Sequence, residues 1–72
     1  MKTTCVICDG PISGGCDDND EFPVWSVFSA DVNGDPTGQV FTCYAYCSAV
    51  TLAQRIAKDN RLELVMEAMP AN

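Results

Sequence analysis

The residues of this chain best suited to chemistry are two pairs of cysteines. Cys5 and Cys8 are separated by two residues near the start, and Cys43 and Cys47 are separated by three residues in the second half. Because the chain contains no histidine, a tetrahedral site for a soft metal would have to consist of thiolates. The pattern indicates a four-thiolate zinc site. A chain of 72 residues buries only about 60% of its unfolded surface, and a structural metal often compensates for such a small core.

The first pair has the outline of a zinc-knuckle turn. Gly10 follows Cys8 by two residues and can adopt the positive φ that lets backbone N–H groups turn toward the sulfurs. The commoner knuckle has proline after its first cysteine and glycine directly after its second, where this chain has Val6 and Asp9. We therefore expect a turn around this pair, with two departures from the usual motif.

The second pair has the wider spacing of i and i+4. Both cysteines could lie on one helical turn, or Cys43 could end a strand while Cys47 lies in the first turn of the next helix. The second arrangement is favoured, because residues 39–42 are strand-like and residues from 48 onward are helix-like. A thiolate at a helix N-terminus is also stabilised by the helix dipole.

An antiparallel hairpin is predicted between the two pairs. Residues 22–30 are the richest apolar stretch, residues 31–38 supply a turn and residues 39–42 return the chain. We expect three aromatic side chains in the core, namely those of Trp25, Phe28 and Phe41. The start of the turn also resembles a calcium loop, but Pro36 stands where that loop needs glycine and Thr42 where it needs an acid.

Residues 45–59 are predicted to form an amphipathic helix, with apolar positions at helical spacing at Ala49, Leu52, Ala53 and Ile56. Asn60 with Glu63 three residues later matches an N-cap signal, so a second short helix over residues 60–69 is preferred. The alternation in the same segment also permits a strand. Its apolar side chains, at Leu62, Val65, Met66 and Met69, would form a last core layer, a docking surface or a self-pairing face.

The order of knuckle, hairpin and helix resembles that of a treble-clef zinc finger over most of residues 5–59. The resemblance implies a small, metal-stabilised α+β fold in one domain over residues 1–72, with one structural zinc ion. It also implies four ligands: Cys5, Cys8, Cys43 and Cys47. Iron bound as in rubredoxin, which would make the chain an electron carrier, is an alternative, although rubredoxin's second pair is a C-x-x-C knuckle. Four reduced cysteines, or two disulfides, without metal are another.

Cys16 is the fifth cysteine and leaves the pairing uneven. It either replaces Cys43 or Cys47 as a ligand or remains a free thiol beside the site. An odd number of cysteines and the absence of an apolar leader after Met1 favour a reducing cytoplasm. No transmembrane run is evident, so no membrane partner is expected. Lacking histidine, a G-x-S-x-G motif and a P-loop, the chain is not expected to be an enzyme.

Charge limits the choice of partner. The formal net charge is −6, and a chain this acidic is repelled by phosphate backbones, so direct binding of nucleic acid by a zinc finger remains only an alternative. We expect a protein-interaction module that binds a basic surface. Fold-level analogy extends this to regulation of transcription, as by small phage-encoded regulators of host RNA polymerase. The candidate contacts are an acidic group, Asp17, Asp18, Asp20 and Glu21, and a basic group, Arg55, Lys58 and Arg61.

Overall fold

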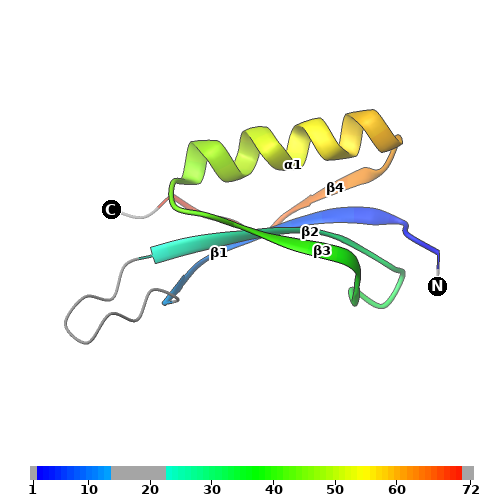
Figure 1. Cartoon of the computed structure of the whole chain (residues 1–72), viewed down its shortest axis with the longest axis horizontal. Coiled ribbons are helices and arrows are strands. Elements are labelled where there is room, and N and C mark those ends of the chain that lie inside the picture. The colour runs from blue at the N-terminus through cyan, green and yellow to red at the C-terminus, as the bar shows by residue number, and fades with distance from the viewer. Residues whose placement is uncertain (1, 14–22, 71–72) are drawn as a thin grey trace.

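Four strands form one sheet, and a single helix lies across one of its faces in the computed structural model, which describes residues 2–13 and 23–70 (Figure 1). The elements in chain order are β1 (Cys5–Ser13), β2 (Pro23–Ala30), β3 (Pro36–Cys43), α1 (Tyr46–Asn60) and β4 (Glu63–Met66). The described residues therefore form a small α+β fold.

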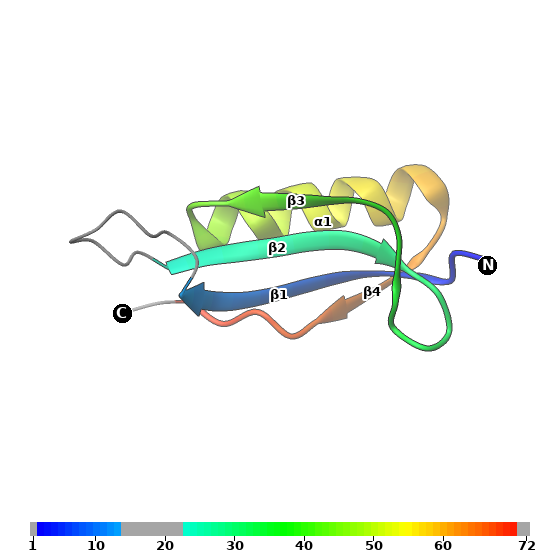
Figure 2. The ribbon, with the colours of Figure 1, turned by 60° about the horizontal axis from the view of Figure 1, so that its bottom comes forward.

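The strand order across the sheet is β3-β2-β1-β4. Antiparallel pairing joins β1 to β2 and β2 to β3, whereas β4 pairs with β1 in parallel. Figure 2 shows the four strands in this order, with α1 behind them. Because a parallel pair needs a long crossover connection, α1 serves as the link from β3 on one edge to β4 on the other.

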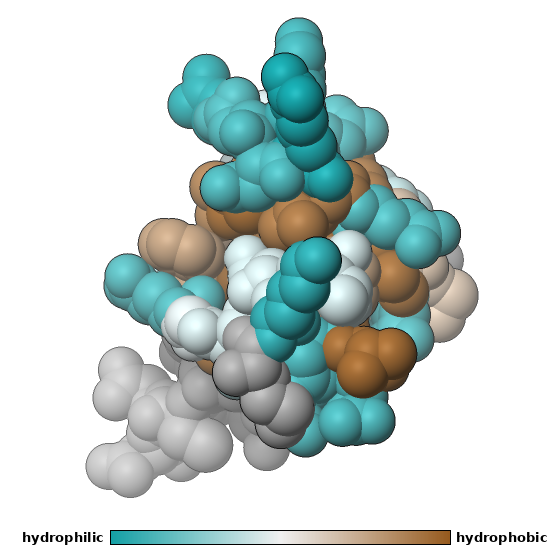
Figure 3. Space-filling view, turned by 90° about the vertical axis from the view of Figure 1, so that its right-hand side faces the viewer, coloured by the Kyte–Doolittle hydropathy of each residue, from teal (hydrophilic) through white to brown (hydrophobic). Residues whose placement is uncertain are grey.

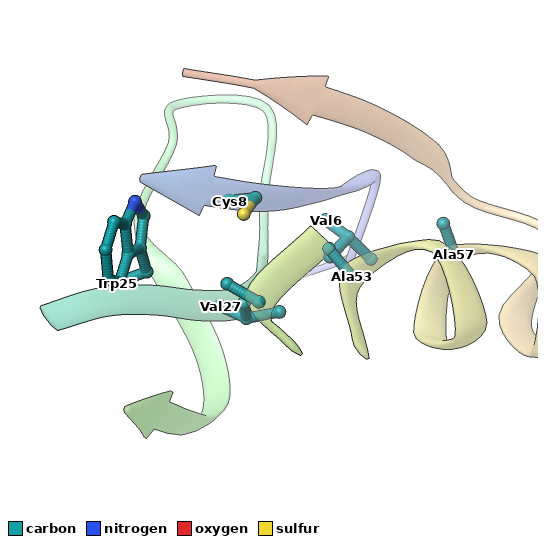
Figure 4. Packing of buried hydrophobic residues seen from close by; sticks show 7 residues of the cluster. Val6, Cys8, Trp25, Val27, Ala53 and Ala57 are labelled. Atoms are coloured by element: carbon teal, nitrogen blue, oxygen red, sulfur yellow. The ribbon is translucent and has the colours of Figure 1, made fainter. Parts of the chain in front are cut away.

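The core lies between α1 and the sheet. Small side chains four residues apart, Ala49, Ala53 and Ala57, form the buried stripe of the helix. They allow the helix to lie close to four buried side chains of the central strands, those of Val6, Cys8, Trp25 and Val27 (Figure 4). Leu52 and Ile56 pack against the rim of this cluster. Burial of these apolar surfaces is the main favourable contribution to the folding free energy.

The predicted hairpin and first helix are confirmed. β2 covers residues 23–30 of the predicted first strand, and residues 39–42 lie within β3. β3 begins earlier than expected, at Pro36, so the predicted turn over residues 31–38 is shorter in the structure. The helix begins and ends within one residue of the expected range of 45–59. Of the three predicted core aromatics, Trp25 is 3% exposed and lies in the core. The strand pairing places the other two on opposite faces of the sheet. Phe28 is half-buried on the face away from the helix, and Phe41, which pairs with Val27, is on the helix side and 37% exposed.

The expected turn around Cys5 and Cys8 is not present, because these residues belong to β1. Residues 5–9 pair continuously with β2 on one side, and Cys5 to Cys8 pair with β4 on the other. A segment hydrogen-bonded on both sides remains extended. The strand also continues beyond Cys8 to Ser13.

The preferred second helix over residues 60–69 is wrong, and the strand alternative is correct. Arg61 adopts a left-handed conformation, with φ of 54° and ψ of 47°, and ends α1. The next backbone N–H, that of Leu62, donates to the carbonyl of Ala57 at 2.8 Å. Asn60 thus belongs to the end of one helix and not to the start of another, and β4 follows as the fourth strand.

Candidate functional site

The first cysteine pair is divided between the two faces of the sheet. Side chains three positions apart in a regular strand point to opposite faces, and the pairing of β1 with β2 is uninterrupted from Cys5 to Asp9. Cys8 is fully buried under α1 (Figure 4). Cys5 lies on the other face, half-buried, with its thiol 4.0 Å from the carbonyl of Ala30.

The second pair lies where the sequence predicted. Cys43 ends β3 and Cys47 is in the first turn of α1, where it is exposed. Cys43 pairs with Trp25 and packs against the core on the same face as Cys8. Burial raises the pKa of the Cys8 thiol, and the nearby Cys43 and Asp9 raise it further. Both effects favour a neutral, unreactive Cys8 thiol.

The arrangement does not bring the four predicted ligands together. Over residues 2–13 and 23–70, no group of three or more cysteine or acidic side chains converges in a way that could hold a metal ion. One ion could bind Cys5 and Cys8 together only if this part of β1 left the sheet. Cys16 lies outside the described residues. Zinc at the four cysteines, and iron in its place, remain predictions from their spacing.

A row of apolar side chains crosses the face of the sheet that α1 does not cover, which we call the open face. The strand register places Ile7 opposite both Phe28 and Val65, and places Phe28 opposite Val40. The four residues therefore form one line across all four strands. Three of them are half-buried, and Val40 is 46% exposed. We call these four residues the apolar row.

Charge is distributed unequally between the two layers. The charged side chains on the open face of the described strands are those of Asp9 and Glu63. Each lies two positions from a member of the apolar row in the same strand, Ile7 or Val65, and therefore points to the same face. Arg55 and Lys58 belong to α1 and Arg61 follows it directly. Figure 3, viewed from the end where α1 stops, shows hydrophilic side chains over the helix and a band of hydrophobic surface directly beneath them. The open face is thus apolar and acidic, and the helix layer carries the basic group.

The predicted contact residues are only partly placed. Arg55, Lys58 and Arg61 are all exposed near the second half of α1. The predicted acidic group lies outside the described residues. Sequence reasoning missed the apolar row, although the two apolar faces of residues 24–29 hinted that both sides of β2 have partners. Identifying the row required the register of four strands, which no single segment encodes.

A cleft adjoins the apolar row at the end of the sheet where β2 turns into β3. Its volume is about 520 Å³, and Cys5, Ile7 and Val65 form part of its lining together with the turn after β2. In that turn the Asp31 carboxylate accepts hydrogen bonds from the backbone N–H groups of Asn33 at 2.8 Å and Asp35 at 3.1 Å. The aspartate that resembled a calcium ligand thus stabilises the turn itself.

Comparison with known proteins adds no family to these observations. No family model matches the chain, and no curated protein or solved structure matches it either. Within the described part of the chain, no helix is both long enough and apolar enough to span a membrane. The open face and its cleft, as features of this fold, are therefore the basis for assigning a function.

Proposed function

We propose that this protein is a protein-interaction module that binds a partner with a basic surface through the open face of its sheet. The observation that carries the proposal is the apolar row Val65, Ile7, Phe28 and Val40, which lies in register across four strands without a described helix or strand covering it. Contiguous apolar surface of this kind commonly marks an interaction site in a small protein.

The charge of the chain supports a partner with a basic surface. The chain has a formal net charge of −6, and the charged residues of the described strands on the open face are both acidic. A basic protein surface would be attracted over long range and would then place apolar side chains against the row. The same acidity opposes contact with phosphate groups, so a protein fits this face better than a nucleic acid.

The more specific proposal is regulation of transcription by binding to RNA polymerase or another basic protein of the same machinery. The support is the analogy with small acidic regulators together with the basic character expected of surfaces that otherwise hold nucleic acid. A structural zinc ion at the four cysteines remains part of this proposal only as a prediction from sequence. Binding through the open face does not depend on it.

Two matched substitutions test the use of the open face. Val40 on the open face and Met66 on the helix side are 46% and 42% exposed, respectively, so replacing either by serine costs little folding stability. Tagged wild type, Val40→Ser and Met66→Ser proteins are used to capture proteins from a host lysate at low salt. The captured proteins are identified by mass spectrometry.

We expect one basic protein to be retained by the wild type and by Met66→Ser and to be lost with Val40→Ser. Raising the salt concentration should also release it, because exposed charges are screened. Recovery of RNA polymerase would support the transcriptional proposal. Equal capture by both variants would contradict the use of the open face.

A further inference from the structure

One wall of the cleft beside the apolar row is a turn that is held by its own hydrogen bonds. The turn that forms one wall is closed by two backbone hydrogen bonds, from Asp31 N–H to the Asp35 carbonyl and from Gly34 N–H to the Asp31 carbonyl, both 3.0 Å long. The Asp31 carboxylate accepts two more hydrogen bonds, from the backbone N–H groups of Asn33 and Asp35. Since four residues of this turn share four hydrogen bonds, the wall is formed before any partner arrives, which lowers the entropy cost of binding.

The opposite wall belongs to the sheet. Cys5 pairs with Glu63, and Ile7 pairs with Val65, in the parallel register of β1 and β4. All four residues line the cleft. Ile7 and Val65 are also members of the apolar row, so the cleft is continuous with the surface proposed to bind a partner. Ile7 and Val65 give the cleft an apolar lining, and Glu63 adds a carboxylate to it.

The cleft contains two acidic groups and, among its described lining residues, no basic one. Glu63 is exposed, whereas Asp31 is 3% exposed and its carboxylate is directed into its own turn. The negative charges of both groups act on anything bound in the cleft. A complementary ligand has an apolar stem to lie on Ile7 and Val65 and a cationic end to meet Glu63. Arginine and lysine side chains have this construction.

We propose that the cleft binds the side chain of an arginine presented by the basic partner. Arginine fits better than lysine because its planar guanidinium can donate two parallel hydrogen bonds to one carboxylate and is less strongly hydrated. This inference rests on the proposed function, and it adds the residue type that the partner places next to the apolar row. The carboxylate of Glu63 is the group that favours a positively charged side chain in the cleft.

The probe for this site is N-acetyl-arginine amide, and its matched control is N-acetyl-citrulline amide, which has the same length without the charge. Each is titrated into the ¹⁵N-labelled full chain while backbone amide shifts are followed. We expect saturable shifts with the arginine compound at the amides of Cys5, Ile7, Asn33, Glu63 and Val65. We expect no saturable shift with the citrulline compound.

Two charge-matched variants locate the contact. Glu63→Gln removes the carboxylate of the cleft, and Glu67→Gln removes an exposed carboxylate that does not line it. We expect the dissociation constant for the arginine compound to rise about three- to tenfold in Glu63→Gln and to stay unchanged in Glu67→Gln, because one partly exposed ion pair contributes modestly. Well-dispersed amide spectra show that both variants are folded.

Equal shifts with arginine and citrulline compounds, or equal weakening in both variants, would overturn the proposal. The proposed function can fail separately. If the arginine compound binds in the cleft but Val40→Ser still captures the basic protein, the open face is not the docking surface while the arginine site remains. If Val40→Ser abolishes capture and the arginine compound does not bind, the docking surface remains and the arginine site is wrong.

Discussion

The indole N–H of Trp25 donates a hydrogen bond to the backbone carbonyl of Met69, 3.0 Å away. Trp25 belongs to β2, an inner strand of the sheet, and Met69 follows β4. This bond therefore holds the segment after β4 against β2. The N–H of Met69 donates in turn to the carbonyl of Gly10 at 3.1 Å. Residues from three parts of the chain therefore meet at one end of the core.

Gly10→Ala should destabilise the protein by about 2 kcal/mol or more. A Cβ at this position would lie 2.7 Å from Cδ1 of Trp25 and 2.8 Å from the carbonyl oxygen of Val24, and the φ of 139° is strained for any L side chain. Urea denaturation followed by tryptophan fluorescence measures the change. Gly38→Ala is the control, because a Cβ there meets nothing within 4 Å. Equal destabilisation by both substitutions would contradict this assignment.

Trp25→Phe should cost about 1–3 kcal/mol of unfolding free energy. The ring remains apolar, but the smaller side chain leaves part of the core unfilled and cannot donate to the Met69 carbonyl. Hydrogen exchange should show faster exchange at Met69 N–H than in the wild type, because the C-terminal segment loses one of its fastenings. Unchanged protection of that amide would show that the indole bond does not hold the segment.

Arg61→Gly should raise the unfolding free energy by about 1 kcal/mol. The residue sits in the left-handed region, which costs an L side chain energy and costs glycine almost none. Arg61→Ala serves as the control, since it removes the same charge and keeps the Cβ. Stabilisation by alanine as large as that by glycine would point to charge and not to backbone conformation.

In metal-free protein, stability should fall as the pH rises above about 9, and Cys8 should be a cause of the decline. The pKa of its thiol is raised by burial in the folded protein. Between the ordinary thiol pKa and the raised one, the unfolded chain has released its proton while the folded chain retains it, so alkali favours unfolding. Cys8→Val should flatten the decline in unfolding free energy measured from pH 8 to pH 10. An unchanged decline would exclude Cys8 as its cause.

Zinc binding is tested by native mass spectrometry of protein purified without chelator. The cysteine spacing predicts one zinc ion per chain in the wild type and in Cys16→Ser, and none in Cys43→Ser. Because Cys5 and Cys8 lie on opposite faces of β1, an ion bound by both must also abolish the contact between Cys8 and Val27. NMR measurements of nuclear Overhauser effects between these two side chains detect that loss. A metal-free wild type would contradict the zinc prediction, and a red, iron-containing one would support the electron carrier.

The sequence by itself determined the elements with strong local signals. The apolar stretch at residues 22–30, the turn after it and the period of residues 45–59 predicted two paired strands and the helix, because each depends on neighbours along the chain. The placement of Cys43 at a strand end and Cys47 at a helix start was also predictable. The net charge, which limits the choice of partner, is a property of composition alone.

Tertiary structure decided the remainder. The segment from Cys5 to Cys8 carries a turn signal, yet hydrogen bonds to β2 and β4 on both sides hold it extended. Residues 63–66 form a strand because β1 offers a free edge beside them and the left-handed Arg61 ends the helix first. The open face exists only once four strands are in register, since pairing between distant segments determines which side of the sheet each side chain joins.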